Sequence, residues 1–162
     1  MTHKASLSGF VKVTTIIINT MFVLTFIGFF TFLKDSGKEF QIVTGTIFFL
    51  VFVITYSLRP IHYTITENQL IIHRLYKDVV IEKTDIKSVS ILDEKKLEWS
   101  IRTFGVGGYY GFFGKFANTQ MGNMTWYATR KDNTVLILTE ENEKIIITPN
   151  EPEAFVVDYY KL

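Results

Sequence analysis

The stretch RTFGVGGYYGFFGKF, residues 102–116, combines residue types that could do chemistry, because glycines, aromatic rings and two cations lie close together. Glycine-rich loops cradle phosphates in nucleotide-binding proteins. A P-loop needs GxxxxGK followed by Ser or Thr, yet Phe116 follows the Gly-Lys pair of this stretch and Tyr109 occupies the first glycine position. The dinucleotide fingerprint GxGxxG fails as well, since Tyr110 replaces its last glycine. Both nucleotide-binding motifs are therefore excluded.

The histidines offer a second possibility, a metal site. His62 and His73 fall opposite each other in a predicted hairpin, but zinc takes three or four ligands and the chain has no cysteine. Asp78 or Glu82 would have to complete such a site, so a solvated histidine pair is the favoured interpretation. No Ser or Thr has an arguable His/Asp arrangement around it. We therefore predict no metal, no cofactor, no catalytic residue and no enzymatic activity.

The glycine and aromatic residues belong to an insertion over residues 93–124, between the fourth and fifth predicted strands. Long loops without structure of their own are usually functional or disordered, and this one is too aromatic for disorder. Three interpretations remain open: the aromatics fold back over the domain, they anchor in the bilayer interface, or they bind a partner. The predicted interaction residues are Arg102, Phe104, Tyr109, Tyr110, Phe112, Phe113, Lys115 and Phe116.

Two uncharged apolar runs in residues 1–58 predict a pair of transmembrane helices, at about 13–33 and 40–58. Each is about the 20 residues needed to cross the hydrocarbon core of a bilayer. The link between them is too short to leave the far interface, which makes the pair a hairpin. The cations outside the hairpin outnumber those in its link, which predicts a cytoplasmic position for both chain ends. These cations are Lys4, Lys12, Arg59, Arg74 and Lys77, against Lys34 and Lys38.

From Arg59 onward the pattern changes to strands. IHYTIT and QLIIHR around the tip Glu67-Asn68 predict a hairpin in which opposite residue numbers add to 135. Further strands are predicted at about 78–82, 86–92, 125–129, 134–139 and 144–148, the last three as an antiparallel meander. A final helix follows Asn150, a candidate N-cap. Seven antiparallel strands and a closing helix predict a small barrel or sandwich for residues 59–162.

This part of the chain resembles the bacterial PH-like family of small membrane proteins, which has the pleckstrin-homology superfold. The residues that carry the resemblance are YTIT at 63–66 with Leu70, IKSV at 86–89, RTFGVG at 102–107, YAT at 127–129, the strand 135–139, and TP at 148–149 followed by Pro152, Glu153 and Phe155. One departure is ENE at 141–143, where relatives often have a glycine. The resemblance implies a fold and a membrane setting, and no activity.

Charge limits the partners that the domain could take. From Arg59 onward Lys and Arg number 13 and Asp and Glu 14, which speaks against nucleic acid and against a basic cup for phosphoinositides. We therefore expect a non-catalytic PH-like module at the cytoplasmic face of a bacterial inner membrane. Its expected role is a protein-binding or self-associating scaffold. The alternative is a lipid-interface sensor whose glycine and aromatic loop dips into the bilayer.

Overall fold

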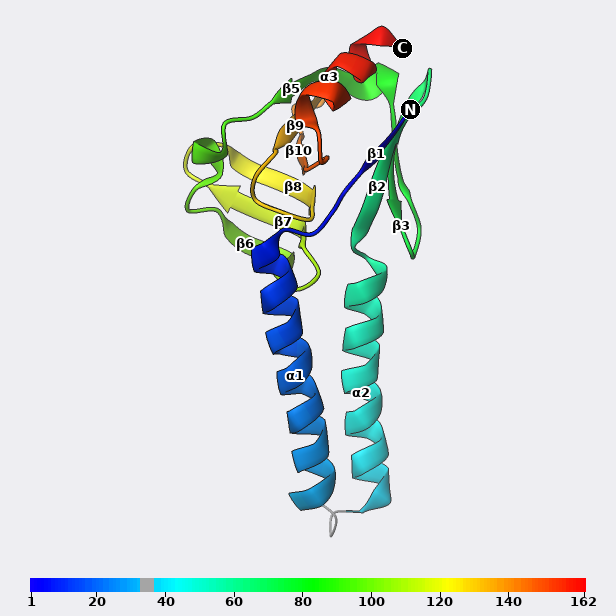
Figure 1. Cartoon of the computed structure of the whole chain (residues 1–162), viewed down its shortest axis with the longest axis vertical. Coiled ribbons are helices and arrows are strands. Elements are labelled where there is room, and N and C mark those ends of the chain that lie inside the picture. Colours follow the sequence, from blue (N-terminus) through cyan, green and yellow to red (C-terminus); the bar gives the residue numbers. More distant parts are fainter. Residues whose placement is uncertain (33–36) are drawn as a thin grey trace.

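The computed structural model describes residues 1–32 and 37–162. A pair of long helices carries a mainly β domain at one end, and both chain termini lie at the far side of that domain (Figure 1). The elements outside the sheets are α1 (Gly9–Phe32), α2 (Lys38–Ser57), the short helices η1 (Lys83–Asp85) and η2 (Glu94–Leu97), and α3 (Pro152–Lys161).

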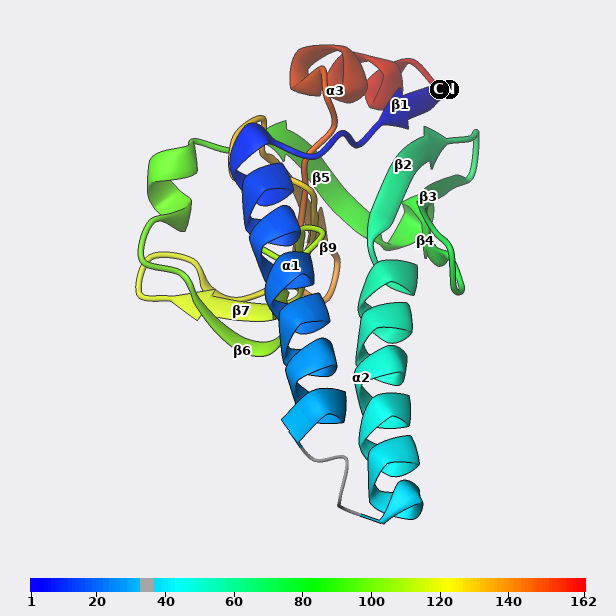
Figure 2. The same cartoon turned by 60° about the horizontal axis from the view of Figure 1, so that its bottom comes forward.

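The helices α1 and α2 are long and apolar enough to cross a membrane, over Gly9–Phe29 and Lys38–Ser57. They lie side by side in both views (Figures 1 and 2), with Phe22 and Phe48 in edge contact at 5.7 Å. α1 begins four residues before the predicted start at Val13, while Leu33 and the predicted link residues 34–36 lie outside the described part. Threonine hydroxyls bond to backbone carbonyls one turn earlier, as Thr46 does to Ile42 at 2.8 Å, which satisfies them inside an apolar layer.

The first sheet ties both helices to the domain. Its order is β1-β2-β3-β4, formed by β1 (Thr2–Lys4), β2 (Pro60–Ile65), β3 (Gln69–Arg74) and β4 (Val79–Glu82). β1, a strand too short to predict, pairs antiparallel with β2. The segments that precede α1 and follow α2 are therefore neighbours in one sheet, which holds those two helix ends together.

The β2–β3 hairpin has the predicted register over most of its length. Tyr63 faces Ile72 and Ile65 faces Leu70, so these opposite numbers add to 135. The prediction is wrong at the open end, where a bulge places Pro60, in place of Ile61, opposite Arg74. Proline lacks an N–H for a regular ladder and is tolerated at the first residue of a strand.

The second sheet has the order β5-β9-β10-β8-β7-β6. Its strands are β5 (Ile86–Ile91), β6 (Ile101–Gly107), β7 (Phe112–Asn118), β8 (Gly122–Ala128), β9 (Val135–Thr139) and β10 (Lys144–Ile147). Of the predicted antiparallel meander, the β9–β10 hairpin is confirmed. The predicted β8–β9 pairing is wrong, because β10 lies between these strands and pairs parallel with β8. The seven predicted strands correspond to β2–β5 and β8–β10, and the described residues add β1, β6 and β7.

The two sheets are not closed into a barrel, so of the two predicted architectures the barrel is wrong and the sandwich describes the domain. The main core lies between the sheets and α3, with Tyr63, Leu70, Ile137 and Phe155 fully buried. The predicted N-cap Asn150 is also wrong: α3 follows Glu151, and the Asn150 carboxamide accepts hydrogen bonds from Ser6 instead.

A second core lies against the second sheet and explains the stretch 93–124. It includes Val11 of α1, Leu97 of η2, Phe112 and Phe116 of β7 and Trp126 of β8. The stretch is therefore not a loop inserted between strands. Its residues build η2, two strands and a turn, and its aromatics on one face bury apolar surface as any core does.

The pairing of β6 with β7 depends on glycine. Gly105 faces Gly114, both have positive φ, and a Cβ at Gly105 would lie 2.3 Å from the Phe113 carbonyl oxygen. We predict that Gly105→Ala lowers the free energy of unfolding by about 3 kcal/mol, the upper end for one strained residue. The melting temperature of the full chain in detergent, followed by circular dichroism, should fall by roughly 5–10 °C.

Gly122 provides the matched control, since its φ is +67° but nothing lies within 4 Å of the Cβ position. Gly122→Asn should change the free energy of unfolding by less than about 1 kcal/mol, because Asn tolerates this conformation. Equal melting temperatures for Gly105→Ala and Gly122→Asn would contradict the close strand approach.

Candidate functional site

The predicted interaction residues divide among three places in the structure, because they lie on both strands and the turn of the β6–β7 hairpin. Tyr109 and Tyr110 form its turn, and Phe112 and Phe116 line one face of β7. Phe104, Phe113 and Lys115 lie on the other face of the hairpin. Arg102 pairs with Phe116 across the hairpin, so the two side chains lie on the same face.

The hairpin turn packs between α1 and α2. The N–H of Gly108 donates to the Gly111 carbonyl at 2.8 Å, and Tyr110 has a φ of 58°. The side chains of Tyr109 and Tyr110 are only 8% and 9% exposed. The turn is thus neither a free loop nor an open lipid anchor, since the chain's own helices cover it.

On the α1 side, polar groups hold the turn. The backbone N–H of Tyr110 donates to the Thr15 hydroxyl at 3.0 Å. Tyr109 donates its phenol proton to the Asn19 carboxamide oxygen at 2.7 Å, and the amide nitrogen of Asn19 donates to the Tyr110 phenol at 3.2 Å. Thr15 and Asn19 are four residues apart and therefore share one helix face. Asn19 thus joins α1 to the hairpin.

On the α2 side, aromatic and cationic groups surround the same turn. The ring of Tyr110 makes an edge contact with the Tyr56 ring at 5.2 Å and with Phe52 at 6.3 Å. The Arg59 guanidinium lies over the Tyr56 ring at 4.3 Å and donates to the Tyr56 phenol at 3.2 Å. Such cation–π contacts strengthen where water is excluded. The turn therefore connects the domain to both helices.

The surroundings of Tyr109 favour its protonated form. Burial, followed by the neighbouring Tyr110, raises the pKa of Tyr109 to about 12. The phenol is protonated at neutral pH already at the ordinary tyrosine pKa of about 10, and the raised pKa extends this protonation into alkaline solution.

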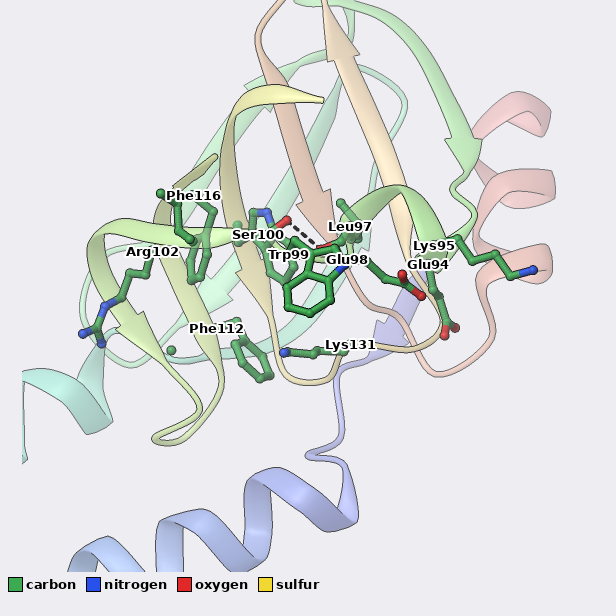
Figure 3. A pocket seen from close by; sticks show the side chains of 13 residues that line it. Glu94, Lys95, Leu97, Glu98, Trp99, Ser100, Arg102, Phe112, Phe116 and Lys131 are labelled. Carbon is green, nitrogen blue, oxygen red and sulfur yellow. Dashed lines mark hydrogen bonds between the residues drawn. The ribbon is translucent and has the colours of Figure 1, made fainter. Parts of the chain in front are cut away.

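A groove of about 1060 Å³ lies on the face of β7 that carries Phe112 and Phe116. Figure 3 shows the side chains that line it. The rings of Phe116 and Trp126 stack at 4.7 Å and form its floor with Phe112. Leu97, the last residue of η2, and Trp99, two residues further on, form one wall of the groove. The groove is apolar at its base and lined by charged residues at its rim, which are Glu94, Lys95, Glu98, Arg102 and Lys131.

Two tryptophans mark this groove. Trp99 is 91% exposed and has a φ of 58°, a conformation that costs free energy in a non-glycine residue. Trp126 is fully buried, and its indole N–H has no hydrogen-bond partner among the described residues. Sequence reasoning assigned neither tryptophan to the site, although a tryptophan next to a charged helix is a signal that could have been used.

The opposite face of the hairpin is partly open. Phe104 is 78% exposed, while Phe113 on the same face is buried. The ammonium group of Lys115 donates to the Thr125 hydroxyl of β8 at 2.8 Å. A register shift between Arg102 and Phe104 places these two residues on opposite faces of β6.

The predicted histidine pair is also present, on the first sheet. The rings of His62 and His73 stack with centroids 4.2 Å apart. His73 contacts the Asp78 carboxylate at 2.7 Å through Nδ1 and the Thr64 hydroxyl at 3.1 Å through Nε2. Among residues 1–32 and 37–162, no group of three or more His, Asp or Glu residues could hold a metal ion.

Residues 61–162 match the family model described as Bacterial PH domain. The match covers more than half of the chain, so the chain belongs to the bacterial PH domain family, in agreement with the resemblance seen in the sequence. No curated protein and no solved structure matches.

The turn contact can be tested at Asn19. Asn19→Leu removes two hydrogen bonds to tyrosine phenols, each worth about 1 kcal/mol between membrane helices. We predict that this substitution accelerates amide hydrogen exchange over residues 107–112 about tenfold or more, measured in the full chain in nanodiscs. Thr20→Val is the control, since the Thr20 hydroxyl bonds to its own helix at Ile16. Unchanged exchange in Asn19→Leu would show that the hydrogen bonds of Asn19 do not hold the turn.

The histidine pair predicts a pH dependence. Burial, followed by His73, lowers the pKa of His62, and the Arg74 N–H lowers the pKa of Asp78. Both groups favour their deprotonated form in the folded chain. They therefore stabilise the fold at pH values above their unfolded pKa values, and this stabilisation is lost as the pH falls. We predict a lower melting temperature at pH 5.5 than at pH 7.5, with a smaller difference in His62→Gln. Identical differences in the two proteins would exclude His62 as the cause.

Proposed function

We propose that the chain is a non-catalytic, membrane-anchored module whose PH-like domain binds a protein segment in the groove beside η2. The two apolar helices would cross a bacterial inner membrane, with the domain on the cytoplasmic side. The cations beside the domain-side helix ends, Lys12 and Arg59, support this orientation under the positive-inside rule. The contact of the β6–β7 turn with both helices would hold the groove at a fixed height above the bilayer.

The observation that carries the proposal is the exposed Trp99 beside a preformed aromatic groove. Tryptophan is enriched among the residues that dominate protein interfaces. Trp99 is almost fully exposed although the floor of Phe112, Phe116 and Trp126 lies next to it. An apolar side chain of a partner could be buried between Trp99 and this floor.

The charges of the groove indicate the chemistry of the partner segment. The rim carries three cations, Lys95, Arg102 and Lys131, against the two carboxylates of Glu94 and Glu98. The Lys131 ammonium lies 5.3 Å from the centroid of the Phe112 ring. Glu94 already accepts a hydrogen bond from the backbone of Asn133 at 3.1 Å. A segment with apolar side chains and a carboxylate fits this arrangement best.

The proposal can be tested by photo-crosslinking. Trp99 is replaced by p-benzoylphenylalanine in the full chain, which is irradiated in native bacterial membranes. The crosslinked segment is identified, synthesised and titrated against the purified wild-type chain in nanodiscs. We expect an apolar and acidic segment that shifts the emission of Trp99 to shorter wavelength on binding.

Variants show whether the groove itself binds. Trp99→Ala should weaken binding of the synthesised segment about tenfold or more, as for an interface hot spot. Lys131→Glu should weaken it up to about fivefold, and Lys161→Glu, on the distant α3, should not weaken it. Crosslinks to lipid alone, or equal affinity for wild type and Trp99→Ala, would exclude the groove as the site. A crosslink to a second copy of this chain would identify self-association.

A further inference from the structure

The end of the domain from which the helices emerge carries exposed apolar side chains on both sides of the helix pair. On the α2 side, Leu75 and Tyr76 form the turn between β3 and β4, and both are exposed. This turn rests on the helix end, because the Tyr76 N–H donates to the carbonyl of Ser57, the last residue of α2, at 3.0 Å. These side chains are therefore at the height where α2 ends.

On the α1 side, the exposed apolar side chains belong to β6. Ile101 and Phe104 are exposed, and β6 pairs with β7 alone among the described strands. Both views show β6 as the strand of the second sheet nearest to the helices (Figures 1 and 2). The turn at its end packs against Thr15 of α1. The free edge of β6 consequently faces the region that a bilayer would occupy around α1.

Lysines accompany the exposed apolar side chains. Lys77 accompanies Tyr76 in the β3–β4 turn, and Lys115 pairs with Phe104 across the hairpin. The acidic residues Glu151, Glu153 and Asp158 are on or beside α3, at the end of the domain away from α1 and α2 (Figure 1). The end of the domain beside the helices therefore carries Lys77 and Lys115, and the Asp78 carboxylate of the same turn is bonded to His73 and to the Arg74 N–H.

We infer that Leu75, Tyr76, Lys77, Phe104 and Lys115 form a basal surface that binds anionic phospholipid headgroups of the bilayer crossed by α1 and α2. Tyr prefers the headgroup level and Phe a deeper position, while ammonium groups meet lipid phosphates. The free N–H groups of the β6 edge can donate to phosphate oxygens. The inference rests on the proposed membrane insertion and does not depend on the groove, which lies on the other face of β6.

A protein strand is a less suitable occupant of this edge. A strand added to β6 would lie about 5 Å beyond it, between the domain and the bilayer. Lipid headgroups and their water already fill that space, and they satisfy unpaired backbone groups without requiring a partner. The bilayer also protects the exposed edge from pairing with other chains.

The experiment uses the full chain, which has no native cysteine, so that single cysteines can be labelled without background. Nitroxide labels are placed in Phe104→Cys and Tyr76→Cys. Val157→Cys on α3 is the water-exposed control and Ile16→Cys on α1 the membrane control; both native side chains are exposed. Accessibility to oxygen and to a water-soluble nickel chelate is measured in nanodiscs of phosphatidylcholine with about one third phosphatidylglycerol.

The expected oxygen-to-nickel ratio is several-fold higher at positions 104 and 76 than at position 157, and highest at position 16. The ratio at position 104 should fall in nanodiscs of phosphatidylcholine alone. It should also fall when the labelled chain carries the substitutions Lys115→Glu and Lys77→Glu. Ratios at 104 and 76 equal to that at 157 would overturn the inference. Protection at 104 from both reagents would overturn it in favour of a protein contact. A water-like ratio at position 16 would instead reject membrane insertion.

Discussion

The contact between the β6–β7 turn and the two helices is the interaction on which the arrangement of this chain depends. Tyr109 and Tyr110 place two phenols between α1 and α2, and Asn19 pairs with both. Polar groups in an apolar layer are costly unless they are hydrogen-bonded. Each polar group of this contact supplies the partner of another, so the helices and the domain stabilise one another's position.

The first sheet provides the complementary restraint. β1 precedes α1 and β2 follows α2, and their pairing fixes the separation of the helix ends at the domain. The Ser6 and Asn150 contact adds a tie from the segment before α1 to the start of α3. With the helices held at this end and packed on the β6–β7 turn, the domain has little freedom to rotate about a flexible tether. A PH-like domain attached in this way keeps its surfaces in a fixed orientation relative to α1 and α2.

Local patterns in the sequence predict the helices and most strands well, because apolar length and alternation are local properties. They predict the Tyr63–Ile72 register for the same reason. In the turn between β9 and β10, Asn142 adopts the positive φ for which relatives often use glycine. The position of β10 between β8 and β9 is not local, and no alternation along either strand encodes it. The helix contact of Tyr110 could not be predicted either. Its partners Thr15 and Tyr56 are far away in the sequence.

The bulge between Arg102 and Phe104 shows how a single irregularity assigns two roles to one strand. In a regular strand, residues two apart share a face, so Arg102 and Phe104 would lie together. The register shift instead places Arg102 opposite Phe116, beside the groove, and Phe104 opposite Lys115, on the other face. The Thr103 hydroxyl donates to the Lys115 carbonyl at 3.1 Å within this irregular segment. β6 can therefore line the proposed protein groove through Arg102 and present Phe104 to the proposed bilayer surface.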